Sequence, residues 1–229
     1  MPRLKHIGFV LFDDLTQLDF TGPLQVLSRI PGVQIHLVAR EAGPVRTDCG
    51  PFILADTRFS ECPQLDLICV PGGWGVDAAM EDAATVDFLR RQAAGAQFMT
   101  SVCTGAFVLG AAGLLEGRKA TTHWRYHASL SRFGAEPVTA RVVRDGNLFT
   151  GGGVTAGIDF ALTIVRELYG EALAQAIQLG LEYDPAPPVN AGSPDKAPAA
   201  VRDAVDARFA PRLEAFLEVV DRVSATADA

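Results

Sequence analysis

The sequence predicts an α/β protein in which a doubly wound, mostly parallel sheet carries helices on both faces. Apolar runs of strand length alternate with segments of helical periodicity along the chain, and this alternation is typical of parallel sheets. The chain has 229 residues, of which 48% are hydrophobic and 21% are charged. This length and composition allow one α/β domain or at most two small ones, and exclude collagen-like and disordered classes.

The first half of the chain holds most of the expected strands. A strand over His6–Phe12 is followed by a long loop, Asp13–Gly22. A helix over Pro23–Ile30 is expected next, because its apolar residues have helical spacing and proline is favoured at a helix start. Further apolar runs predict strands at Val33–Ala39, Cys49–Leu54, Leu65–Val70 and Gln97–Val102, with a helix at Ala83–Ala94.

The second half begins with a hairpin over Val142–Phe149, because the turn residues Asp145, Gly146 and Asn147 separate two apolar pairs. Helices are expected at Ala156–Tyr169 and Glu171–Leu181. Five prolines between residues 184 and 198 indicate an extended arm, and Ala199–Val223 has the pattern of a final amphipathic helix. We therefore expect one domain over residues 1–183, with residues 184–229 packing on that domain or on a second copy.

Charge and hydropathy narrow the possible partners. The net charge is −7 and the longest basic run is Arg90–Arg91, which disfavours a nucleic-acid partner. We expect no signal peptide and no membrane span, because the longest uncharged stretch, Gln92–Leu115, contains polar residues and glycines. The cysteines lack CxxC spacing, which favours reduced thiols in a cytoplasmic protein; they are Cys49, Cys62, Cys69 and Cys103.

Cys103 is the candidate nucleophile. An apolar strand turns at this residue into a helix of small residues, as in a nucleophile elbow, although Ser101 stands where the hydrolase motif has glycine. A thiol at a helix N-terminus is expected to favour the thiolate. The alternative interpretation is a buried structural cysteine.

The glycines of Pro71–Gly75 follow another strand and should reach the same sheet edge as Cys103. There, the N–H groups of Gly72 and Gly73 could approach a developing negative charge, as in an oxyanion hole. An ordinary turn at a strand exit is the alternative.

Asp19 should lie at this edge as well, in the loop after the first strand. Its neighbours Leu18 and Phe20 are apolar and could raise the pKa of its carboxyl, which would then both donate and accept a proton. The alternative is a helix cap just before Pro23.

His123 is a further candidate, since a Cys–His dyad with Cys103 would suit nucleophilic catalysis. His123 and His127 have metal-ligand spacing, but no third ligand is apparent and no metal is expected. The chain contains neither GxGxxG nor a GKS/T triplet, so no nucleotide cofactor is inferred.

Several motifs together resemble the isocyanide hydratases of the ThiJ/PfpI superfamily, and the resemblance runs from about His6 to Ala200. These motifs are Gln17–Pro23, Pro71–Gly73, Ser101–Gly105, Gly113–Trp124, Arg144–Leu148, Thr150–Asp159 and Leu181–Pro188. The resemblance implies a flavodoxin-like fold, a catalytic domain over residues 1–183, a homodimer, and no metal or organic cofactor.

The same resemblance implies roles for individual residues. It makes Cys103 the nucleophile and Asp19 the acid and base, with Thr104 beside the thiol. Gly72 and Gly73 correspond to backbone donors near the site, and Val154 would lie close to Cys103. Trp74 stands where a small or polar residue is expected, so its side chain bears on the size of the pocket and the choice of substrate.

The implied reaction adds water to an isocyanide and gives an N-substituted formamide through a thioimidate on Cys103. A glyoxalase or deglycase of the superfamily would use the same cysteine. A protease would need a histidine partner, and Thr104 stands where the proteolytic branch has histidine. A ligand-binding or redox-sensing module is a non-enzymatic alternative. AraC-type regulators share these motifs, but their two helix-turn-helix units need more residues than follow Tyr183.

Overall fold

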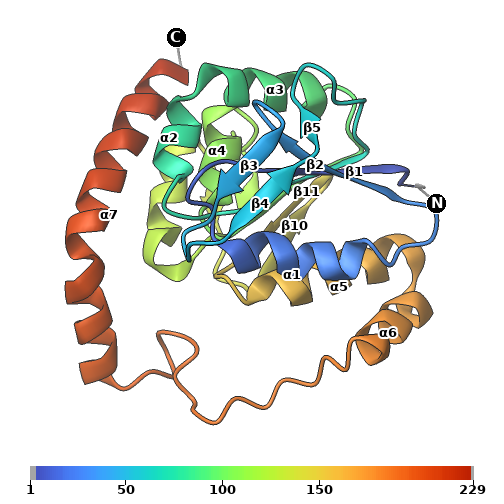
Figure 1. Ribbon diagram of the computed structural model, residues 1–229. Helices are drawn as coiled ribbons and strands as arrows, with labels where there is room; N and C mark the ends of the chain where they lie inside the picture. Colours follow the sequence, from blue (N-terminus) through green and yellow to red (C-terminus); the bar gives the residue numbers. More distant parts are fainter. Residues whose placement is uncertain (1–3, 228–229) are drawn as a thin grey trace.

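The computed structural model describes residues 4–227. A sheet of seven strands lies at its centre, between layers of helices (Figure 1). The strand order is β10-β11-β7-β6-β1-β2-β5. Neighbouring strands are parallel except for β10, which runs antiparallel to β11. The strands are β1 (His6–Val10), β2 (Gln34–Ala39), β5 (Thr57–Arg58), β6 (Leu67–Val70), β7 (Phe98–Val102), β10 (Val142–Asp145) and β11 (Leu148–Gly151). The predicted mostly parallel, flavodoxin-like sheet is confirmed.

Helices cover both faces of this sheet, and each face has its own apolar core. One layer contains α1 (Gln17–Leu27), α5 (Ala156–Tyr169) and α6 (Glu171–Gly180), and Figure 1 shows α1 beside α5. The other layer contains α2 (Val76–Glu81), α3 (Ala83–Ala93), α4 (Gly105–Ala111) and α7 (Ala199–Ala227). Burial on both faces explains why the central strands are continuous apolar runs rather than alternating ones.

Several short elements differ from the sequence prediction. The expected segment Cys49–Leu54 is instead β4 (Phe52–Ala55), which pairs with an unpredicted strand, β3 (Gly43–Arg46). The sequence also missed α2, the short parallel pair β8 (Lys119–Ala120) and β9 (Glu136–Pro137), and the 3₁₀ helix η1 (Trp124–Phe133). The elements α2, β8 and β9 are too short for apolar periodicity to reveal them. The ten residues of η1 form a 3₁₀ helix, whose three residues per turn do not give the 3.6-residue pattern of an α-helix.

The prediction that helix α1 begins at Pro23 is wrong. The helix begins at Gln17, so Asp19 lies in its first turn rather than in a loop. Asp48, from a distant turn, supports this early start: its carboxylate accepts hydrogen bonds from the Thr16 hydroxyl at 2.7 Å and from the Gln17 N–H at 3.4 Å. Helix starts need such acceptors because their first N–H groups have no partner within the helix.

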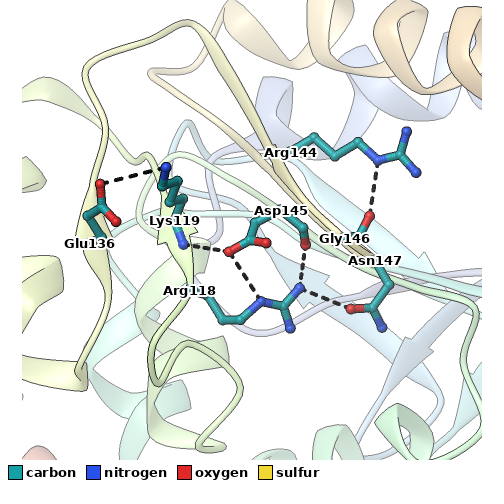
Figure 2. A network of polar contacts seen from close by, with 7 residues as sticks. All are labelled: Arg118, Lys119, Glu136, Arg144, Asp145, Gly146 and Asn147. Atoms are coloured by element: carbon teal, nitrogen blue, oxygen red, sulfur yellow. Dashed lines mark hydrogen bonds and ion pairs between the residues drawn. The ribbon is translucent and has the colours of Figure 1, made fainter.

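The hairpin β10–β11 is held at its turn by polar contacts, which Figure 2 shows. Arg118 donates hydrogen bonds to the carbonyl oxygen of Asp145 and to Oδ1 of Asn147, and the N–H of Lys119 donates to the Asp145 carboxylate at 2.8 Å. Lys119 also pairs with Glu136. These contacts fix β11, the neighbour of β7, and so support the strand that leads to Cys103.

An exposed arm, residues 184–198, connects α6 to α7 and runs along one edge of the molecule (Figure 1). Two buried residues, Phe216 and Val220, hold α7 against α2, α4 and η1. Four ion pairs also bind it: Arg125–Asp206, Arg212–Asp77, Arg132–Asp221 and Arg222–Glu81. Within residues 4–227, no helix is long and apolar enough to cross a membrane.

Candidate active site

Cys103 occupies a sharp turn between β7 and α4. Its φ of 56° lies in the left-handed region, which residues with a side chain rarely adopt. The Cys103 N–H donates to the carbonyl oxygens of Gly151 at 3.1 Å and Gly152 at 2.8 Å, and its own carbonyl accepts from the Thr122 hydroxyl at 2.6 Å. The turn is therefore held from both sides and has the form of a nucleophile elbow.

Gly105 explains why small residues follow the cysteine. A Cβ atom on Gly105 would lie 2.2 Å from the carbonyl oxygen of Val70. Only glycine lets α4 start this close to the end of β6, which brings the ends of β6 and β7 together.

Asp19 lies against Cys103 in the interior of the protein. Its side chain is 0% exposed, and burial raises the pKa of its carboxyl to about 7. The Gly72 N–H donates to Oδ2 at 3.0 Å, and both this bond and the neighbouring Cys103 thiol lower the pKa by less than burial raises it. The other oxygen, Oδ1, is buried without a hydrogen-bond partner. A carboxyl in this setting can exchange a proton near neutral pH.

The source of this burial differs from the sequence argument. Leu18 is 38% exposed, whereas Phe20 is buried. Asp19 is enclosed mainly by segments distant in sequence, since a Cβ atom on Gly72 would lie only 2.8 Å from its Oδ2 and 2.6 Å from the Thr104 nitrogen.

The prediction of a thiolate at Cys103 is wrong. Burial and the neighbouring Asp19 carboxylate raise the pKa of the thiol well above its ordinary value. The Thr104 N–H lowers that pKa, but by less than burial raises it. The thiol is therefore neutral near pH 7, and a base must remove its proton when it reacts.

The oxyanion-hole interpretation of the glycines is also wrong. The Gly72 N–H is bonded to Asp19, and the Gly73 N–H donates to the Thr104 hydroxyl at 3.1 Å. These N–H groups orient the acid and the threonine instead of pointing to a substrate. Gly73 has a φ of 140° and a Cβ atom there would meet the Asp14 carbonyl oxygen at 2.4 Å, so the turn requires glycine.

A pocket of about 260 Å³ opens onto the thiol. Six residues singled out in the sequence line it: Gly73, Trp74, Cys103, Thr104, His123 and Val154. The other lining residues were not predicted from the sequence; they are Thr16, Asp48, Trp124, Arg125, Tyr126, Val205 and Phe209. Val205 and Phe209 come from α7, and no local signal in the sequence connects that helix to Cys103.

The His123 side chain is neutral and accepts a hydrogen bond from a backbone N–H group. Its Nδ1 accepts the Arg125 N–H at 3.4 Å and so caps η1. Burial and the Arg125 charge lower the pKa of the imidazole to about 4. The ionisable group that acts on the thiol is Asp19 and not His123, so the arrangement favours a Cys–Asp pair over a Cys–His dyad. Among residues 4–227, no three His, Cys, Asp or Glu side chains are grouped as metal ligands.

Comparison with known proteins places this geometry in context. Residues 5–167 match the model of the DJ-1/PfpI family. An isonitrile hydratase from Pseudomonas putida is 58% identical over 220 residues, which cover 96% of each chain. The crystal structure of a ThiJ/PfpI family protein from Pseudomonas syringae superposes with a TM-score of 0.91 at 43% identity, covering 96% of this chain and 90% of that one. Drosophila melanogaster DJ-1beta superposes with a TM-score of 0.70 at 27% identity, covering 79% of this chain and 98% of its own.

Proposed function

Because the chain belongs to the DJ-1/PfpI family, we propose that its Asp19–Cys103 pair adds water to an isocyanide, R–N≡C, and releases the formamide R–NH–CHO. The identity of 58% to an isonitrile hydratase, over 96% of both chains, supports this activity. The observation that carries it is the buried Asp19 carboxyl next to the neutral thiol of Cys103, which lines the pocket.

In the first step, the Asp19 carboxylate takes the thiol proton and passes it to the terminal carbon of the isocyanide. That carbon carries a lone pair, so it can accept a proton and then becomes electrophilic. The sulfur electron pair forms the C–S bond, giving the thioimidate R–N=CH–S–Cys103, and Asp19 ends the step as a carboxylate.

In the second step, Asp19 removes a proton from water while the oxygen attacks the thioimidate carbon. The proton moves to nitrogen and gives the tetrahedral species R–NH–CH(OH)–S–Cys103. When the C–S bond breaks, the hydroxyl proton returns through Asp19 to sulfur, and the formamide leaves. Atoms and charges balance over the cycle, and one carboxyl group serves both halves because its pKa is about 7.

Thr104 and Gly72 have positioning roles in this proposal. Gly72 holds Oδ2 of Asp19 through its N–H and so fixes the orientation of the carboxyl. Thr104 accepts the Gly73 N–H and supplies an N–H that hydrogen-bonds the sulfur. These contacts keep the reacting groups in place.

The direct test is formation of N-phenylformamide from phenyl isocyanide by the purified protein, with Cys103→Ala as the control. Turnover by the wild type and none by the variant would support the proposal. Turnover of methylglyoxal with no reaction of the isocyanide would favour the glyoxalase alternative instead.

We also propose that the protein is a cytoplasmic homodimer. The hairpin β3–β4 exposes Phe52 at 65% and Leu54 at 67%, and such side chains favour an interface. A stable interface buries about 800 Å² per partner. Four free cysteines support a reducing compartment. The test is light scattering at micromolar concentration, and a measured mass equal to that of the monomer would contradict the proposed homodimer.

A further inference from the structure

The wall of the active-site pocket includes a helix outside the matched family domain. That match ends at residue 167, whereas α7 begins at Ala199. Val205 and Phe209 of α7 nevertheless line the same pocket as Cys103. The segment after the proline-rich arm is therefore part of the site.

Aromatic rings dominate the part of the wall near α7. The Phe209 ring packs almost parallel to Trp74, with centroids 5.7 Å apart and an angle of 18° between the planes. Trp124 and Tyr126 line the pocket as well. Trp74, expected from the sequence to alter the pocket's size, is thus one face of an aromatic wall that α7 completes.

The charged groups near these rings are paired within the protein. Arg125 lies over the rings of Trp124 and Phe209, at 5.1 and 5.5 Å from their centroids, and binds Asp206 of α7. Arg212 lies over the Trp74 ring at 5.5 Å and pairs with Asp77. Because these two cations have partners, the rings of the wall offer a substrate apolar faces and no free positive charge.

Two parts of α7 have different contacts. Beyond Pro211, the helix is anchored by the buried side chains of Phe216 and Val220. Before Pro211, Val205 and Phe209 face the pocket, and no residue is fully buried. Proline inside a helix removes one backbone hydrogen bond, so substitutions on the pocket side should leave the anchored side intact.

We propose that Phe209, with Trp74 and Trp124, determines substrate specificity by selecting isocyanides whose R group is a flat aromatic ring. This inference rests on the proposed hydratase function and names its substrate class. Aromatic groups gain most from stacked or edge-on contacts with other rings. The cavity of about 260 Å³ lies just below the usual range for pockets of drug-sized ligands, about 300–1,000 Å³, and suits a single small ring.

The test compares phenyl isocyanide with n-butyl isocyanide in the wild type and in Phe209→Ala, Phe209→Leu and Phe209→Tyr. Phe209→Ala should raise KM for phenyl isocyanide by about 10-fold or more, the scale of one lost aromatic contact. KM for n-butyl isocyanide should change less than about 3-fold, and kcat should stay within about 2-fold for both substrates. Phe209→Leu should fall between alanine and wild type, and Phe209→Tyr should restore the phenyl preference.

The matched control is Val201→Ala on the same helix, because Val201 is 47% exposed and does not line the pocket. It should change neither substrate's KM. If Phe209→Ala alters both substrates equally or neither, Phe209 does not select the ring, and the inference is overturned. An equal loss of kcat for both substrates with a lower melting temperature would also overturn it, since Phe209 would then be structural.

A binding measurement separates this inference from the proposed function. Calorimetry with the products N-phenylformamide and N-butylformamide needs no turnover. Tighter binding of the phenyl compound that is lost in Phe209→Ala would support the aromatic wall even if neither isocyanide reacted. If both isocyanides are hydrated but neither binding nor KM shows a preference for the phenyl compound, the hydratase function is supported and the role of Phe209 is contradicted.

Discussion

The carboxyl of Asp19 lies next to the thiol of Cys103, although the first is on α1 and the second directly follows β7. Burial raises the pKa of both groups, and it brings that of Asp19 to about 7. The pair therefore holds its last proton on sulfur, and the carboxylate is the base next to it.

Asp19→Asn should lower isocyanide turnover by at least about 100-fold, the usual scale for loss of a general acid–base group. The substitution keeps the acceptor for the Gly72 N–H but cannot take the thiol proton. Formamide production is the measurement, and His123→Gln is the comparison, since it should retain most activity. Loss of turnover in the histidine variant with normal turnover in Asp19→Asn would assign proton transfer to His123.

The pH profile of kcat/KM should show an acidic limb with an apparent pKa of about 7. Burial raises the pKa of Asp19 to that value, so the carboxylate that accepts the thiol proton forms only as the pH rises through it. Activity should fall about tenfold for each pH unit below the limb. A flat profile between about pH 5 and 7 would mean that Asp19 is already ionised there.

Asp19→Asn should also make the protein more stable in alkaline buffer. The folded-state pKa is raised, so this carboxyl favours folding below its unfolded value of about 4, and that contribution is lost as the pH rises to about 7. Urea unfolding at about pH 8 should show the variant more stable by about 2–4 kcal/mol. The difference should shrink near pH 4, and an equal difference at both pH values would contradict the titration of Asp19.

Iodoacetamide at neutral pH should label Cys49 before Cys103, without loss of turnover. Cys49 is exposed, whereas Cys103 is buried and its pKa is raised, and only a thiolate reacts. Labelling of Cys103 should rise about tenfold per pH unit above neutrality, and inactivation should follow that label. Peptide mass spectrometry distinguishes the two sites, with Cys49→Ser as control. Faster labelling of Cys103 at pH 7 would restore the thiolate expected from sequence.

The central strands could be predicted from the sequence, because strands that are buried on both faces consist of continuous runs of apolar residues. The sharp turn at Cys103 could also be predicted, because the strand, the cysteine and the small residues of the helix follow one another directly in the sequence. The start of α1 could not be predicted from the local sequence, because the hydrogen-bond acceptor that supports it is Asp48, which lies in a distant turn. Local proline preference was outweighed there by a tertiary hydrogen bond.

The roles within the site were harder to predict than its location. The N–H groups of Gly72 and Gly73 have partners on α1 and beside Cys103, and no pattern around the glycines reveals them. Likewise, Phe209 belongs to an amphipathic helix whose spacing indicates an apolar face but not what that face covers. Sequence patterns describe one element at a time, whereas pKa values and pocket walls depend on how elements meet.

The left-handed backbone at Cys103 also limits which amino acids evolution or design can place there. Glycine and asparagine enter this conformation most readily, whereas β-branched residues such as threonine are strongly disfavoured. An exchange of sulfur for a threonine hydroxyl would therefore meet a conformational barrier before any chemical one. A lineage that changed to such a nucleophile would first have to rebuild the turn between β7 and α4.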